Sequence, residues 1–369
     1  KSVLNFIDIF NNQGVFHRMN NLIVIIPAYN AEAYLSKAVR SVLEQPCKNI
    51  RVIIVNDGST DKTAILCEEI AATDTRVTVL HQDNKGVSCA RNAGISWVLE
   101  QKDITTGYLG FCDADDLWKS GCITQQTFDS FNASKADIAG FSYWRTDEHV
   151  KRYSISNQYH SHITNIQERG SVDGLLIGTF CAHLYNIEMV RQFSLRFPEN
   201  VTRNEDIIFM RQAVFCANRI IYREETLYLY RTNRKSTTHR STDITSTMLN
   251  TCRAWSKASH WAERQDVSPI KKEAWNQMCV STAATILLET ARLMAENGHN
   301  SKHILNTITH EPYYEQIYAL NVENLAWWQQ PDLLLFRKNH QKFCRKYRLR
   351  GSIKKPGLKS YLYRNGKIK

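Results

Sequence analysis

The chain has 369 residues, of which 43% are hydrophobic and 22% are charged. This balance is typical of a globular protein with a large core and argues against a disordered chain. The formal net charge is +11, and 13 of the 47 Lys and Arg residues lie between Arg337 and Lys369, where no Asp or Glu occurs. The rest of the chain is nearly neutral, which excludes a basic surface spread over the whole protein.

The ten cysteines include no C-x-x-C pair, so neither a zinc ribbon nor a redox dithiol is expected. Most of them lie among apolar residues, as free buried thiols do, which favours a reducing cytosol over the alternative of a secreted disulfide scaffold. No apolar run approaches the roughly 20 residues that span a bilayer, and the first residues show no signal-peptide pattern.

Apolar runs of strand length alternate with helical patterns in the first third of the chain. The predicted strands cover 22–26, 51–55, 76–80 and 108–112, and the predicted helices cover 31–43, 63–72 and 88–99. The strands are apolar throughout, as parallel strands covered on both faces are. The alternation predicts an α/β fold with a doubly wound, mixed and mostly parallel sheet.

The rest of the chain contains fewer strands and then becomes helical. Strands are predicted at 138–144, 219–222 and 225–230, and a long helix at 270–296 ends at Asn297-Gly298. The predicted organisation is an N-terminal arm (1–20), an α/β domain (21–240, with halves 21–118 and 119–240), a helical region (241–335) and a basic amphipathic tail (336–369).

In doubly wound sheets the ligand binds beyond the carboxyl ends of the strands. Pro27, Tyr29 and Asn30 follow the first strand; Pro27 ends it, and Asn30 can cap the next helix. Asp57 and Gly58 follow the second strand, where a carboxylate can accept hydrogen bonds from a base or a ribose and glycine allows a tight turn. Ordinary strand-to-helix turns with capped helices are the alternative explanation.

The loops after the third and fourth strands are charged. Lys85, Gly86 and Arg91 lie near a helix N-terminus, which favours an anion such as a diphosphate, unless the cations are only solvated. In Asp113-Ala114-Asp115-Asp116, alternate side chains of an extended chain point the same way. Asp113 and Asp115 can therefore converge on one hard divalent ion, unless the acidic run only caps a helix.

These segments, in this order, resemble the family 2 glycosyltransferases of the GT-A fold. The resemblance lies in Pro27-Ala28-Tyr29-Asn30, residues 55–61, residues 84–88, residues 90–94 and Asp113-Ala114-Asp115-Asp116. It implies that a nucleotide diphosphate sugar, most simply a UDP-sugar, is the donor and that Mn²⁺ or Mg²⁺ is the cofactor. In that family Asp57 would contact the base, Asp113 would lie near the ribose and the metal, and Asp115 would bind the metal. The other expected donor-pocket residues are Pro27, Tyr29, Asn30, Lys85, Gly86, Arg91 and Ala114.

A later stretch, Asn204–Phe209, resembles the Glu-Asp motif of the same family. The resemblance implies that Asp206 is the general base of an inverting transfer and that Glu205 lies beside the acceptor or diphosphate. A carboxylate within hydrogen-bond reach can take the proton of an attacking hydroxyl. The alternative is the first turn of a helix, where acidic residues complement the dipole.

Three further residues are weaker candidates for contacts with the acceptor or the diphosphate: His183, Arg231 and His239. The segment Cys181-Ala182-His183-Leu184-Tyr185 departs from the Trp-Asn-Lys-Leu-Tyr that many family members carry there. A strand end and a polar loop are the alternative explanation for Arg231 and His239.

The C-terminal tail combines apolar and basic side chains. The apolar and aromatic residues on one predicted helical face are Leu333, Phe336, His340, Phe343 and Tyr347. Basic residues beside apolar anchors suit an anionic membrane surface, although a solvated tail or an RNA contact are alternatives. We expect a cytoplasmic protein, peripheral on the inner face of the cytoplasmic membrane, that acts on a glycan or lipid-linked acceptor without a nucleic-acid partner.

Other classes fit the motifs less well. A nucleotidyltransferase that makes activated sugars usually has a Gly-rich basic loop near the first strand, which Pro27–Asn30 is not. A dinucleotide-binding dehydrogenase would have G-x-G-x-x-G there. A noncatalytic binding module would not need Asp113, Asp115 and Asp206 together. The resemblance places the enzyme in bacterial surface polysaccharide or lipopolysaccharide synthesis.

Overall fold

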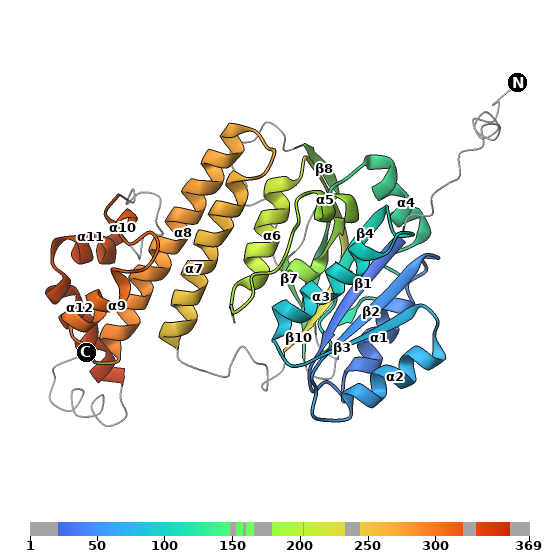
Figure 1. Ribbon diagram of the computed structural model, residues 1–369, viewed down its shortest axis with the longest axis horizontal. Helices are drawn as coiled ribbons and strands as arrows, with labels where there is room; N and C mark the ends of the chain where they lie inside the picture. The colour runs from blue at the N-terminus through green and yellow to red at the C-terminus, as the bar shows by residue number, and fades with distance from the viewer. Residues whose placement is uncertain are drawn as a thin grey trace, which may run out of the picture.

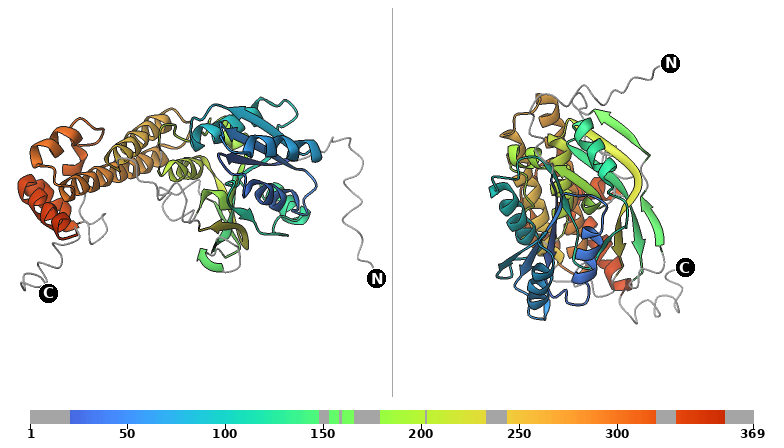
Figure 2. Two further views of the ribbon diagram at one scale, coloured as in Figure 1. Left: turned by 90° about the horizontal axis from the view of Figure 1, so that it is seen from below. Right: turned by 90° about the vertical axis from the view of Figure 1, so that its right-hand side faces the viewer.

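The computed structural model describes residues 21–147, 153–157, 160–165, 179–201, 203–232, 244–319 and 330–354. A ten-stranded sheet with flanking helices forms the body, and a pair of long helices leads away from it to a group of shorter ones (Figure 1). The turned views in Figure 2 show the same two-part arrangement.

Four parallel strands make up the first half of the sheet. They are β1 (Asn21–Ala28), β2 (Ile50–Asp57), β3 (Val77–Gln82) and β4 (Gly107–Phe111), in the order β3-β2-β1-β4. The connecting helices are α1 (Leu35–Leu43), α2 (Thr63–Thr73) and α3 (Val87–Glu100). Since parallel crossovers are right-handed, the reversal of strand order at β1 places α3 on the opposite face from α1 and α2. Every residue of β1 is buried, which explains its continuous apolar sequence.

The second half of the sheet continues from β4 in the order β9-β6-β10-β5. The strands are β5 (Leu117–Trp118), β6 (Ile138–Thr146), β7 (Tyr153–Asn157), β8 (His162–Asn165), β9 (His183–Asn186) and β10 (Arg219–Arg231), and the helical elements are α4 (Gln125–Ser134), η1 (Phe180–Ala182), α5 (Ile187–Gln192) and α6 (Glu205–Cys216). The two strands predicted at 219–222 and 225–230 are one strand, whose pairing with β6 shifts register between Arg223 and Tyr228. Because β6 and β10 are parallel and β9 is antiparallel to its neighbours, the predicted mixed, mostly parallel α/β sheet is confirmed.

A helical region follows the sheet, as predicted. It consists of α7 (Ile244–Glu263), α8 (Pro269–Glu296), α9 (Ser301–Ile308), α10 (Gln316–Ala319), α11 (Gln330–Lys338) and α12 (His340–Lys354). The predicted boundary near residue 240 lies outside the described residues. Among those residues, α8 alone is long and apolar enough to cross a membrane, although no such run was expected. That helix packs against α7, α9, α10 and α12, and more than half of its most apolar window is buried, as in a core helix.

The apolar residues predicted to anchor the tail to a membrane lie inside the protein. Leu333 and Phe336 in α11, and Phe343 and Tyr347 in α12, are at most 1% exposed. The predicted face is real, but it is divided between two helices and α12 packs on α8. The prediction that these four side chains meet a bilayer is therefore wrong, because the fold already buries them.

The predicted packing roles of cysteine and tryptophan agree with the structure where it describes them. All ten cysteines are free thiols, and all but Cys89 are buried. Trp255 and Trp275 are at most 2% exposed, and their ring centroids lie 6.4 Å apart between α7 and α8.

Candidate functional site

Asp57 joins the ends of two neighbouring strands at the carboxyl edge of the sheet. Its carboxylate accepts hydrogen bonds from Gln82 Nε2 (2.7 Å) and from the backbone N–H groups of Lys85 and Gly86 (2.9 Å each). Gly58 has φ +65°, and a Cβ there would lie 2.5 Å from the Asn84 backbone nitrogen. The close packing of the loops after β2 and β3 therefore depends on this glycine.

The loop after β1 contacts the loop after β2. Asn30 has φ +48°; its N–H donates to Ser59 Oγ (3.1 Å), and its Oδ1 accepts from the Thr60 N–H (2.8 Å). Since α1 begins only at Leu35, the prediction that Asn30 caps this helix is wrong, and Asn30 instead ties the two loops together. Tyr29, beside it, is 49% exposed, while Pro27 remains in β1.

The acidic loop that follows β4, residues 113–116, is hydrogen-bonded to residues of β10. Asp116 is buried, and its carboxylate accepts from the Tyr228 hydroxyl (2.5 Å) and the Arg231 N–H (2.7 Å). The same hydroxyl accepts from the Asp113 N–H (3.2 Å). The supporting roles of Asp116 and Tyr228 were not predicted; the only signal in the sequence is a third Asp directly after the D-x-D pair.

Asp113 and Asp115 lie on the open side of this loop and are partly exposed, whereas Ala114 between them is buried. Burial and the charge of Asp113 raise the pKa of Asp115 to about 6. Two neighbouring carboxylates destabilise each other's charged forms in this way unless a cation is added.

Arg91, from α3, connects the acidic loop to α6. Its Nη2 donates to Asp113 Oδ1 (2.8 Å), and its Nη1 donates to Glu205 Oε1 (3.2 Å). The guanidinium lies 4.5 Å and 5.1 Å from the ring centroids of Phe180 and Phe197. Burial opposes the charge of Arg91, yet the attraction of its two carboxylate partners holds its pKa above the usual value.

Glu205 and Asp206 occupy the first turn of α6. Burial raises the pKa of both carboxyls, and Arg91 partly counteracts that rise. The negative charge of Asp113 also raises the pKa of Asp206, so the two acidic segments share one electrostatic environment. A carboxylate with a raised pKa is better suited to accept a proton near neutral pH.

His183 does not reach the site. It lies on β9 with no exposed surface, and its Nδ1 is 3.0 Å from the Thr179 carbonyl oxygen. Burial lowers the pKa of His183 to about 4, so the ring is neutral. The prediction of an acceptor contact through His183 is wrong, because the strand pairs between β4 and β6 and turns this side chain into the core.

Arg231 lies beside the acidic loop, and His239 falls outside the described residues. Arg231 is 5% exposed, and its guanidinium lies 4.8 Å from the ring centroid of Tyr34. Its positive charge acts against the raised pKa of Asp115. Within the described part of the chain, Arg231 Nε has no hydrogen-bond acceptor, which leaves a buried donor near the carboxylates.

The residues present fit a divalent cation. Across the described ranges, no three His, Cys, Asp or Glu side chains gather closely enough to form a complete metal site. Asp113 and Asp115 nevertheless offer hard oxygen ligands of the kind that Mg²⁺ and Mn²⁺ prefer, with phosphate and water completing the shell. A cation there would also offset the burial and the repulsion from Asp113 that together raise the pKa of Asp115.

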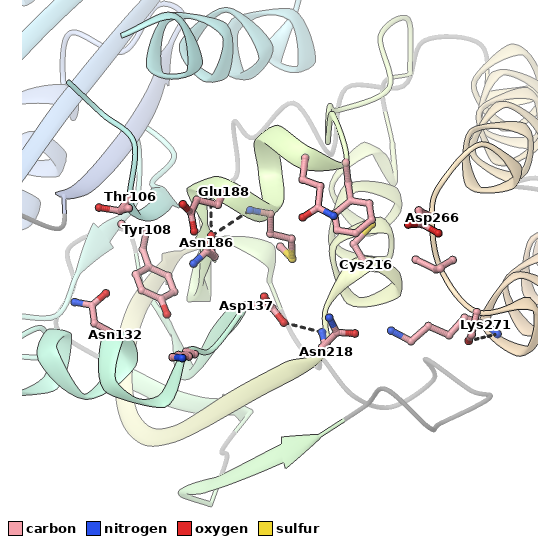
Figure 3. Close-up of a pocket in the computed structure, with 17 residues that line it drawn as sticks. Thr106, Tyr108, Asn132, Asp137, Asn186, Glu188, Cys216, Asn218, Asp266 and Lys271 are labelled. Carbon is pink, nitrogen blue, oxygen red and sulfur yellow. Dashed lines mark hydrogen bonds between the residues drawn. The ribbon is translucent and has the colours of Figure 1, made fainter. Parts of the chain in front are cut away.

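A separate polar cavity of about 670 Å³ lies at the opposite edge of the sheet. Figure 3 shows Thr106, Asp137 and Asn218, which lie where strands begin, facing Lys271 near the start of α8. Lys271 is buried, and its Nζ donates to the Ala217 carbonyl oxygen (2.8 Å). None of the predicted site residues lines this cavity, so it is distinct from the carboxylate cluster.

Residues 23–192 match the family described as Glycosyl transferase family 2. The glycosyltransferase GlyG of Streptococcus pneumoniae is 30% identical over 222 residues, which cover 58% of this chain and 71% of GlyG. This chain belongs to glycosyl transferase family 2. The uncharacterized glycosyltransferase EpsJ of Bacillus subtilis is also 30% identical, over 58% of this chain and 62% of EpsJ. The chain thus spans less than two thirds of the length of EpsJ.

The fold of this family 2 chain is similar to solved structures over almost its whole length. The S. aureus TarS fragment 1–349, in complex with UDP-GlcNAc, superposes with a TM-score of 0.64 at 15% identity. The match covers 94% of this chain and 92% of that fragment. It therefore includes the helical region after the sheet and identifies the GT-A fold.

Proposed function

We propose that this protein is an inverting glycosyltransferase. It transfers a sugar from a nucleotide diphosphate sugar, of which UDP-sugars are the first candidates, to a hydroxyl group of a glycan or a lipid-linked acceptor. The observation that carries the proposal is the bridge from Asp113 through Arg91 to Glu205, because it brings the acidic loop and the Glu-Asp motif into one site.

The donor binds along the carboxyl edge of the four parallel strands. Asp57 has a fixed orientation because three N–H donors hold its carboxylate, which suits a specific contact with the base. Asp113 and Asp115 hold Mn²⁺ or Mg²⁺, and this cation, when bound, neutralises the charge of the departing diphosphate. Lys85 and the buried guanidinium of Arg231 supply further positive charge near the phosphates.

Asp206 is the base that takes the proton from the acceptor hydroxyl. Its position in the first turn of α6, next to Glu205, supports this role, because Arg91 links that turn to the acidic loop. Burial raises its pKa, which strengthens it as a proton acceptor while Arg91 limits the rise. Glu205 is the positioning residue, since its carboxylate is engaged by Arg91.

The setting that we propose is bacterial surface polysaccharide or lipopolysaccharide assembly at the cytoplasmic face of the membrane. Family membership supports a biosynthetic role. The TarS fragment binds UDP-GlcNAc, which makes that sugar nucleotide the first donor to test.

A donor screen tests the proposal. The full chain is incubated with UDP-Glc, UDP-Gal, UDP-GlcNAc, UDP-GalNAc or GDP-Man, with and without Mn²⁺, and the released nucleotide is measured. We expect metal-dependent release from one UDP-sugar. Pyrophosphate release from UTP and a sugar 1-phosphate would instead support a nucleotidyltransferase, and donor binding without any release would support a binding module.

A further inference from the structure

The outer side of α11 and α12 carries a row of exposed cationic and aliphatic side chains. Leu334 and Leu349 are 52% and 62% exposed, and the exposed Lys338, Lys342 and Arg345 lie between them. Leu334 and Lys338 are four residues apart in α11, and Lys342, Arg345 and Leu349 are three or four residues apart in α12, so each set lies on the side of its own helix opposite the buried residues. We call these five residues the outer basic stripe.

The fold does not use the cations of this stripe. Other basic side chains of the same helices have partners: Lys346 pairs with Asp332 (2.7 Å), and Arg348 donates to the His299 carbonyl oxygen (3.0 Å). Within the described part of the chain, no hydrogen bond or ion pair engages the side chains of the three stripe cations. These three cations and the two exposed leucines are therefore free to contact another molecule.

The sequence that carries the stripe has charge of one sign. No Asp or Glu occurs from Leu333 to the end of the sequence, and Asp332 is already engaged by Lys346 and Tyr347. A row of cations with aliphatic side chains at both ends matches an anionic bilayer, because phosphate headgroups meet the charges while leucines enter the apolar boundary. A nucleic-acid backbone would use the cations but not the leucines.

The stripe also lies in a suitable place. Figures 1 and 2 show α11 and α12 at the end of the α7–α8 pair, away from the sheet. The sequence that follows α12, residues 355–369, contains five Lys and Arg and no acidic residue. We propose that the outer basic stripe docks the protein on an anionic phospholipid bilayer. This surface is separate from the carboxylate site, so its binding does not require the proposed transfer reaction.

Vesicle co-sedimentation of the full chain tests the proposal. One set of vesicles contains phosphatidylcholine with phosphatidylglycerol, and the other contains phosphatidylcholine alone. Each cation near an anionic surface contributes enough that Lys338→Gln, Lys342→Gln and Arg345→Gln together should weaken binding about a hundredfold. Leu334→Ser with Leu349→Ser should also weaken it, which an ionic contact alone would not explain.

The matched control removes the same charge elsewhere. Lys37, Lys102 and Lys257 are exposed and lie outside the stripe, so changing all three to Gln should leave vesicle binding within about twofold of the original protein. UDP binding by all variants reports whether the fold and the sheet edge are intact. Equal binding by the stripe variant and the original protein would overturn the proposal, as would equal binding to neutral vesicles. Binding to polyuridylate but not to vesicles would assign the cations to RNA instead.

Discussion

Asp113 and Glu205 share one guanidinium, that of Arg91, at distances of 2.8 Å and 3.2 Å. Arg91 is 3% exposed and packs against the rings of Phe180 and Phe197, so the release of either carboxylate would leave a buried charge with one partner fewer. The acidic loop and the first turn of α6 therefore keep a fixed relative position.

Replacing Arg91 tests that link. Arg91→Met should reduce the free energy of unfolding by about 3–5 kcal/mol, since it leaves the mostly buried Glu205 and the partly exposed Asp113 without their shared cation. Arg91→Lys keeps the charge but cannot form the planar two-sided contact, so it should retain more stability than the Met variant and still lose most transfer activity. Urea unfolding and donor turnover measure the two effects.

The exposed pair Arg51–Asp103 provides the control for Arg91. Its side chains are 44% and 64% exposed, so Arg51→Met should change stability by less than about 1 kcal/mol. Similar losses in the Arg51 and Arg91 variants would show that the buried bridge has no special role.

The proposed division of labour between Asp206 and Asp115 predicts two separable defects. Asp206→Asn should lower kcat by about 10²–10⁴ and leave the Kd of UDP with Mn²⁺ unchanged, since only the base is removed. Asp115→Asn should weaken UDP binding only when Mn²⁺ is present. Calorimetry of UDP binding and the rate of nucleotide release distinguish them. A loss of UDP affinity in the Asp206 variant equal to that in the Asp115 variant would refute the assignment of the base.

The Tyr228 hydroxyl should contribute more to stability and to UDP binding than that of an ordinary buried tyrosine. Tyr228→Phe removes the donor to Asp116 and the acceptor for the Asp113 N–H, so we expect a loss of about 1–3 kcal/mol and weaker metal-dependent UDP binding. Tyr185→Phe is the matched control: the Tyr185 hydroxyl donates to the Phe180 carbonyl oxygen (3.1 Å) and not to the acidic loop, so its loss should leave UDP binding unchanged. Denaturant unfolding and calorimetry give both quantities, and equal UDP affinity in the two variants would contradict the supporting role.

His183 should make stability depend on pH. Its folded pKa of about 4 lies below the usual 6.5, so the unfolded chain takes up a proton that the folded protein does not. The stability that the neutral His183 contributes is therefore fully present above about pH 6.5. It decreases as the pH falls from there to about 4, by roughly 3 kcal/mol in total. His183→Gln should remove that component when unfolding curves of the two proteins are compared across this range. Unchanged pH dependence would show that the imidazole is accessible to protons in the folded state.

The parallel strands and the acidic loop were predictable because they depend on local patterns. Strands such as the one that contains Leu22–Ile26 are buried on both faces, so their consecutive residues are all apolar. Strand ends then locate Asp57 and Asp113 without further information. The position of Arg91 near the donor loops also followed from the start of its helix.

Other features depend on contacts between distant segments. The hydrogen bond between Asp116 and Tyr228 requires the pairing of β5 with β10, which no local pattern reveals. His183 lies among Cys181, Ala182 and Leu184, all of them buried, and that apolar context was the available signal for its burial. The helical face through Phe336 and Phe343 was predicted, but an amphipathic pattern does not identify which partner covers it.

The antiparallel pairing of β5 with β10 has a consequence for when the proposed cation site can form during synthesis of the chain. Leu117 and Trp118 directly follow the acidic loop, yet they pair with Leu229 and Tyr228, more than a hundred residues later. A nascent polypeptide that ends at residue 192, where the family match stops, already contains every strand of the first half of the sheet. It still lacks Tyr228 and Arg231, which donate hydrogen bonds to Asp116. Such a fragment should fold its nucleotide edge early and become competent for Mn²⁺ only after residue 231 has emerged. Expression of shortened versions for crystallisation should therefore extend past that point.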